Sequence, residues 1–157
     1  MYDSKAAIRD IESYSNPSSP RYGRLLNWPD AVWPIWHYGI GLSDTHIFDT
    51  GAVWRAFEKV DAKFVLGVDH LHQPDKKVIA RLKLAVQVFE SWKYHLIGWN
   101  CEHLARLAAT GEAKCYAIGP IFGLYPVGDG INHDANRIFK ELSDQSTETR
   151  WEPVQSS

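Results

Sequence analysis

The stretch "IWHYGIGLSDTHIFDT" (residues 35–50) predicts a β-hairpin. Two segments rich in β-forming residues flank a short polar sequence, "SDT", that is typical of a turn. If the residues on either side of this three-residue loop pair with each other, Gly39 lies opposite Asp49, and Asp49 lies diagonally from His37 on one face of the sheet. A two-residue loop would reverse the parity and place Asp49 on the other face.

Side-chain alternation along the first strand separates His37 from its bulky neighbours. His37 shares a face with Gly39 and Gly41, whereas the aromatic and aliphatic side chains between them take the opposite face. Glycine inside a strand often marks close approach by another backbone. We therefore expect a helix to dock on the face that carries His37.

The remaining sequence predicts an α+β fold in which an antiparallel sheet packs against helices. Further strands are expected at 52–60, 62–68 and 114–119, and helices at 1–15, 75–92, 100–110 and 134–142. Asp75 is the expected N-cap of the second helix, and Gly111 is the expected terminator of the third. The expected organisation is an N-terminal helix and linker at 1–20, the main domain at 21–143, and a frayed polar tail at 144–157.

Length and charge limit the classes of function. The chain has 157 residues, enough for one domain with its own core, and a formal net charge of −2 with no basic stripe, so nucleic acid is not an expected partner. The N-terminus is charged and has no apolar segment typical of a secretory signal. We expect a cytoplasmic protein without a transmembrane anchor, whose two cysteines are free thiols.

Cys101 opens the predicted helix at 100–110. It shares the inward face with Leu104, Ala105 and Ala108, and it lies in the first turn, where unpaired N–H groups and the helix dipole favour a thiolate. His37 is the best-placed candidate base for such a nucleophile. The alternatives are that Cys101 is a small buried hydrophobic residue and that His37 is a structural histidine.

These motifs resemble those of the lecithin retinol acyltransferase (LRAT)-like family. The resemblance rests on a His-Tyr pair followed by alternating glycines, a polar turn and a second strand, and on "NCEHLARLAATG" much later, over about residues 22–119. The family is a circularly permuted branch of the papain-like NlpC-type hydrolases, in which the histidine strand precedes the cysteine helix. The resemblance implies that Cys101 is the nucleophile and His37 the general base. The family's third polar residue falls on Asp49, where histidine is often found instead.

The chemistry implied by the resemblance is thiol acyl transfer through an acyl-thioester, with the main-chain N–H of Cys101 as a candidate oxyanion donor. The substrate expected is an ester or thioester, such as a small acyl ester or a lipid. An amidase or peptidase could use the same Cys-His pair, and a non-catalytic binding module on the same fold is the alternative from a different class.

The aromatic residues around the candidate base in the sequence have two possible interpretations. Trp28, Trp33, Trp36 and the neighbouring Tyr38 could line a pocket for the acyl chain, or they could belong to the core. His70 and His72 could share one strand face, but no further metal ligands accompany them at suitable spacing, so neither a metal nor a cofactor is expected.

Two further residues near the nucleophile have a structural interpretation. His103 cannot share the thiol's face of the helix, because it lies two positions after Cys101, so it is expected either on the helix surface or as a residue that supports the site without facing the thiol. Cys115 is expected to be a core thiol in the strand at 114–119.

Overall fold

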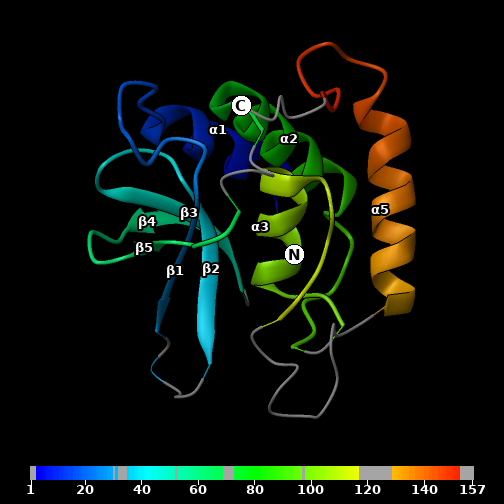
Figure 1. Ribbon diagram of the computed structural model, residues 1–157, viewed down its shortest axis with the longest axis horizontal. Coiled ribbons are helices and arrows are strands. Elements are labelled where there is room, and N and C mark those ends of the chain that lie inside the picture. Colours follow the sequence, from blue (N-terminus) through cyan, green and yellow to red (C-terminus); the bar gives the residue numbers. More distant parts are fainter. Residues whose placement is uncertain are drawn as a thin grey trace.

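The computed structural model describes residues 3–29, 31, 35–51, 53–68, 73–96, 98–116 and 129–152, with the side chains of all these except 129–132. The α+β class is confirmed for this part of the chain (Figure 1). The elements are α1 (Ser4–Tyr14), β1 (Leu25–Pro29), β2 (Trp36–Gly41), β3 (His46–Thr50), β4 (Trp54–Glu58), β5 (Lys63–Phe64), α2 (Asp75–Val88), α3 (Cys101–Thr110) and α5 (Asp129–Ser143).

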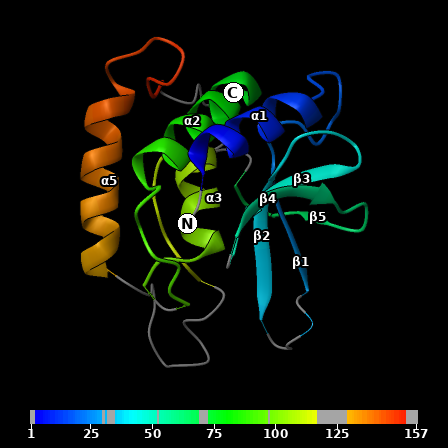
Figure 2. The same ribbon diagram turned by 180° about the vertical axis from the view of Figure 1, so that it is seen from behind.

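The strands form one antiparallel sheet in the order β4-β3-β2-β1-β5. The ribbon views from the two sides show α3 lying between this sheet and α5 (Figures 1 and 2). α3 packs against both β2 and α2, and α1 packs against α2 and β4. The helix that begins at Cys101 therefore lies directly against the strand that carries His37.

The hairpin formed by β2 and β3 has the predicted register. Gly39 pairs with Asp49, and the N–H of Leu42 donates a 2.9 Å hydrogen bond to the carbonyl of His46. The three-residue loop is therefore confirmed. Because successive side chains alternate, Asp49 lies on the same face of the sheet as His37.

The sheet also contains a strand that the sequence does not predict. β1 pairs with β2 on one side and with β5 on the other. Its first two residues are both buried, Leu25 in the core beneath the helices and Leu26 on the opposite face, so the strand has no polar alternation to reveal it. Of the strand expected at 114–119, residues 114–116 are not in a strand, and the rest lies outside the described residues.

The glycine face of β2 does not receive a helix, so that prediction is wrong. A side-chain carbon at Gly39 would meet the Phe48 carbonyl oxygen at 2.6 Å and the Trp28 ring at 3.1 Å, and one at Gly41 would overlap the Arg21 carbonyl oxygen. Gly39 makes room for β3 and for Trp28, and Gly41 makes room for the turn that contains Arg21. α3 instead packs on the opposite face of β2, where the bulky side chains lie.

The helices beneath the sheet share one core with that bulky face. It contains apolar residues from α1, from the sheet, from α2 and α3, and from α5, among them Ile11, Ile40, Leu82, Leu104 and Phe139. The inward face predicted for α3 is confirmed, because Cys101, Leu104, Ala105 and Ala108 are all buried. This packing holds α3, the helix that begins at Cys101, from both sides.

The predicted helix boundaries are partly wrong. α2 has Pro74 at its N-cap position, so Asp75 is its first residue and not its cap. α2 ends at Val88 and not at 92, because the next residue, Phe89, turns to pack its ring against Trp92 at 4.7 Å and Trp99 at 4.9 Å. α5 begins earlier than the predicted 134, at Asp129.

α3 ends as the sequence predicts. It runs to Thr110, and Gly111 follows with φ 84°, the left-handed conformation that glycine adopts most readily.

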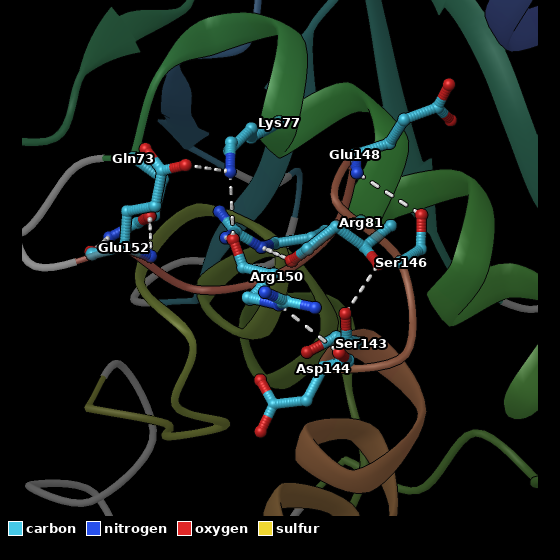
Figure 3. Close-up of polar contacts among 10 residues, drawn as sticks. Gln73, Lys77, Arg81, Ser143, Asp144, Ser146, Glu148, Arg150 and Glu152 are labelled. Carbon is cyan, nitrogen blue, oxygen red and sulfur yellow. Dashed lines mark hydrogen bonds and ion pairs between the residues drawn. The ribbon is translucent and has the colours of Figure 1, made fainter.

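The segment after α5 was expected to be frayed, but it packs against α2 as far as Glu152 (Figure 3). The buried Arg81 side chain donates hydrogen bonds to two main-chain carbonyls of the segment, and its guanidinium carbon lies 3.5 Å from the centroid of the Trp151 ring. The Gln73 amide and the Glu152 main chain exchange two further hydrogen bonds. A buried guanidinium needs acceptors, and the carbonyls of this segment supply them.

Candidate active site

Cys101 and His37 meet where the first turn of α3 lies against β2. The Cys101 Sγ atom is 3.7 Å from the His37 Nδ1 atom. The thiol residue is buried, with 5% of its surface exposed, and His37 is half-buried. For Nδ1 to accept the thiol proton, the neutral imidazole must carry its own proton on Nε2.

Asn100 fixes the main chain on which Cys101 sits. Its Oδ1 accepts from the N–H groups of Glu102 and His103 at 3.0 and 3.3 Å, which caps the helix. Its Nδ2 donates to the Leu96 carbonyl at 2.6 Å and to the Cys115 sulfur at 3.3 Å. Every hydrogen-bonding atom of this side chain is therefore used, and the N-terminus of α3 has one defined position.

His103 is fully buried, so of its two predicted places the helix surface is wrong, and the residue instead supports the start of α3. Its Nδ1 accepts a 3.0 Å hydrogen bond from the main-chain N–H of Asn100 and completes a capping box. The ring also stacks on Trp99, with centroids 5.8 Å apart. The histidine takes the place that Glu or Gln usually fills in this motif. Cys115 is buried, as expected, although not in a strand.

Burial favours the neutral form of the Cys101 thiol. Burial raises the pKa of Cys101 to about 12, and a hydrogen bond from the main-chain N–H of Tyr38 opposes this only in part, while Asp49 and Glu102 raise the pKa further. The lowered pKa expected from the helix terminus is therefore wrong, because desolvation of the thiolate outweighs the helix dipole. Chemistry at this sulfur requires a base to remove the proton during attack.

Asp49 lies on the His37 face of the sheet and is buried. Its Oδ1 accepts a 3.4 Å hydrogen bond from Arg55 Nε. Burial raises the pKa of Asp49 to about 6, against the opposing charges of Arg55 and His37. The carboxyl group is thus poised to change charge near neutral pH, beside the candidate base. Its role as the orienting third residue stays a prediction.

Tyr94 is a residue of the site that sequence reasoning missed. Its side chain forms a hydrogen bond with Cys101, and burial together with the nearby thiol raises the pKa of the phenol. Tyr94 is therefore a neutral donor at ordinary pH, with 36% of its surface exposed. It lies in the irregular segment between α2 and α3, where no periodicity links it to Cys101.

The predicted aromatic residues have different surroundings. Trp28 is buried and stacks on the His37 ring, with centroids 5.9 Å apart and planes 24° apart, so it supports the imidazole. Trp36 is half-buried and packs against the core, and Tyr38 is buried. Trp33 lies outside the described residues.

The other histidines considered in the sequence are not part of this site as the structure describes it. His46 stacks on Tyr14 of α1, with centroids 4.2 Å apart. His70 and His72 are outside the described residues. Over the part of the chain that the structure covers, no group of three or more His, Cys, Asp or Glu side chains could hold a metal ion, and no helix there is long and apolar enough to cross a membrane.

Comparison with known proteins gives no relative: no family model, no curated protein and no solved structure matches the chain. The functional interpretation therefore depends on the geometry of the site and on the motif resemblance seen in the sequence.

Proposed function

We propose that this protein is a cysteine-dependent acyl hydrolase or acyltransferase of the LRAT-like, permuted papain-like type, acting on an ester or thioester. The observation that supports it is the 3.7 Å contact between Cys101 Sγ and His37 Nδ1 at the N-terminus of α3. A thiol, a base within reach of its proton and a nearby carboxyl group are the parts that acyl transfer through a thioester requires.

In the first half-reaction, His37 Nδ1 takes the proton from Cys101 as the sulfur attacks the substrate carbonyl carbon. The main-chain N–H of Cys101 and the Tyr94 hydroxyl are the donors available for the resulting oxyanion. The tetrahedral intermediate collapses, the carbon–oxygen or carbon–sulfur bond to the leaving group breaks, and the imidazolium returns its proton to that group. The product is an acyl-thioester on Cys101.

In the second half-reaction, neutral His37 removes a proton from water or from an acceptor hydroxyl as that oxygen attacks the thioester. The carbon–sulfur bond breaks, and the proton returns to the thiolate of Cys101. Asp49, ionised above its pKa of about 6, stabilises the imidazolium in both halves. Both cysteines are free thiols, which fits the reducing cytoplasm expected from the sequence.

Intact-mass measurement with a short-chain activated ester tests this proposal. The protein should gain one acyl group, hydroxylamine should remove it, and Cys101→Ser should abolish the adduct while Cys115→Ser retains it. Adduct formation by Cys101→Ser would overturn the nucleophile assignment. Labelling of Cys101 by a peptide aldehyde or vinyl sulfone, without any ester turnover, would favour an amidase or peptidase instead. If the folded, reduced protein reacts with neither class of reagent, a non-catalytic binding module is the better interpretation.

A further inference from the structure

The residues that follow the two reacting groups are joined to each other. Tyr38 follows His37 on β2, and Glu102 follows Cys101 on α3. Arg106, one turn further along α3, connects them: its Nε donates to Glu102 Oε1 at 2.7 Å, and its side chain forms a hydrogen bond with the Tyr38 hydroxyl. The guanidinium carbon lies 5.5 Å from the centroid of the Tyr38 ring.

We propose that Tyr38, Glu102 and Arg106, here called the clasp, are positioning residues that set the separation of the Cys101 thiol and the His37 imidazole. This inference deepens the proposed function and rests on it for its kinetic readout. It also changes the interpretation of Tyr38, which the sequence suggested as a substrate contact.

The clasp is buried and its polar groups are satisfied on several sides. Glu102 is 1% exposed, and its second carboxylate oxygen accepts a 3.1 Å hydrogen bond from the main-chain N–H of Tyr116. The Tyr116 ring lies 4.8 Å from the Arg106 guanidinium carbon, and the Tyr38 hydroxyl also forms a hydrogen bond with Asn27 of β1. The clasp thereby ties α3 to two strands of the sheet.

A buried ion pair of this kind contributes little net stability, because desolvation of its charges offsets their attraction. Its directional hydrogen bonds do fix geometry, since guanidinium and carboxylate groups meet in few arrangements. Apolar packing alone leaves a helix free to slide along a strand by small amounts. We therefore interpret the buried Glu102–Arg106 pair as a device that fixes where α3 lies on the sheet, and not as a source of net stability.

Tyr38 transmits this position to the reacting atoms through its main chain. Its N–H donates to the Cys101 sulfur, and its peptide bond joins it to His37. A shift of Tyr38 would therefore move the donor to the thiol and the imidazole together. Because proton transfer requires close approach, a misplacement on the order of 1 Å can lower the rate by about 10²-fold.

The test uses three variants of the clasp in the full chain: Tyr38→Phe, Arg106→Met and Glu102→Gln. Two assays are used. The first gives kcat and KM for an activated ester, and the second gives the rate of Cys101 alkylation by iodoacetamide, followed by intact mass across pH in a Cys115→Ser background. We expect kcat and the alkylation rate to fall about tenfold, with KM changed by less than about threefold, because the groups act on position and not on binding. Arg106→Lys should recover little, because an ammonium lacks the planar fork.

The matched control is Arg137→Met, which removes an arginine with an i,i+4 ion pair to Glu141 on the exposed surface of α5. Arg137→Met should leave both rates unchanged. Circular dichroism and thermal melting identify the variants that remain folded. If a charge variant does not fold, Tyr38→Phe still tests the proposal, because it loses only one hydroxyl group.

Combination with His37→Ala separates positioning from general destabilisation. If the clasp acts mainly through the imidazole, a clasp substitution should slow alkylation much less once His37 is absent, with only the part that passes through the Tyr38 N–H remaining. An equal slowing in both backgrounds, or unchanged rates in a folded clasp variant, would overturn the proposal. Alkylation could depend on both the clasp and His37 while no ester is turned over. That result would support the positioning role of the clasp and reject the proposed acyl chemistry.

Discussion

Asp49 and Arg55 occupy paired positions on neighbouring strands, and the Arg55 Nε atom lies 3.4 Å from Asp49 Oδ1. Only 2% of the Asp49 side chain is exposed, whereas 56% of the Arg55 side chain is. Because the cation is largely hydrated, its attraction does not offset the burial of the carboxylate, and the pKa of Asp49 is raised to about 6.

Asp49→Asn should stabilise the protein at high pH. The folded protein holds the Asp49 proton more tightly than the unfolded chain does, so the free energy of unfolding falls as pH rises from about 4 through 6 and stays lower above that. A shift of about two units corresponds to roughly 3 kcal/mol as an upper limit. Urea unfolding at pH 8 should show most of this gain in Asp49→Asn, and most of the difference should be gone at pH 4, near the ordinary pKa of aspartate.

The same substitution should lower kcat, because asparagine cannot stabilise the imidazolium. His46→Ala is the matched control for activity, since His46 lies at the other end of β3 against Tyr14 and should be dispensable. Equal damage from both substitutions would reject Asp49 as the third residue.

Arg55→Gln should move the acid limb of the pH–rate profile to higher pH. Removal of the guanidinium takes away an opposing charge, so the pKa of Asp49 rises further above about 6 and a higher pH is needed to ionise it. The measurement is kcat/KM for an activated ester between pH 5 and 9, with Lys59→Gln, which loses only a pair with the exposed Asp61, as control. An acid limb that does not move would show that Asp49 does not control it.

Tyr94→Phe should lower kcat by about 10- to 100-fold with little change in KM, in the range typical of removing one oxyanion donor. The ring is kept and only the hydroxyl that bonds to Cys101 is lost. Tyr14→Phe is the matched control, because Tyr14 is a comparably exposed tyrosine on α1. An unchanged kcat in Tyr94→Phe would remove the phenol from the reaction.

The hairpin and α3 could be predicted because their signals are local. The loop length fixes the pairing of Gly39 with Asp49, and Asn100 and Gly111 mark the two ends of the helix. The sequence also predicts that Cys101 approaches His37, and the structure has this contact. The predicted reason is wrong, because the helix packs on the bulky face of β2 and not on the glycine face.

What could not be predicted depends on tertiary packing. The hydrogen bond from Tyr94 to the thiol comes from an irregular segment, and the burial that raises the pKa of Cys101 is set by neighbours distant in sequence. The polar sequence around Trp151 looked like a frayed tail because its partner, the buried Arg81, lies on α2. None of these residues carries a periodic signal of its own.

Gly111→Ala tests whether the C-terminal segment is bound to the end of α3. Alanine at Gly111 would be destabilising for two reasons. The backbone has the left-handed φ of 84°, and the added methyl group would lie 2.6 Å from atoms of the Trp151 ring. The backbone conformation costs about 1 kcal/mol and the overlap about 1–3 kcal/mol more, so urea unfolding should show a loss of roughly 2–4 kcal/mol.

A double-mutant cycle with Trp151→Ala separates these two costs. In the Trp151→Ala background the ring is gone, so Gly111→Ala should cost only about 1 kcal/mol for the backbone, and the two substitutions should be strongly non-additive. Gly67→Ala is the matched control, because Gly67 has φ 82° and nothing within 4 Å of the added carbon, so it carries the backbone cost alone. If Gly111→Ala and Gly67→Ala cost the same in the wild-type background, Trp151 does not pack on Gly111, and the segment that Arg81 holds is not packed against the end of α3.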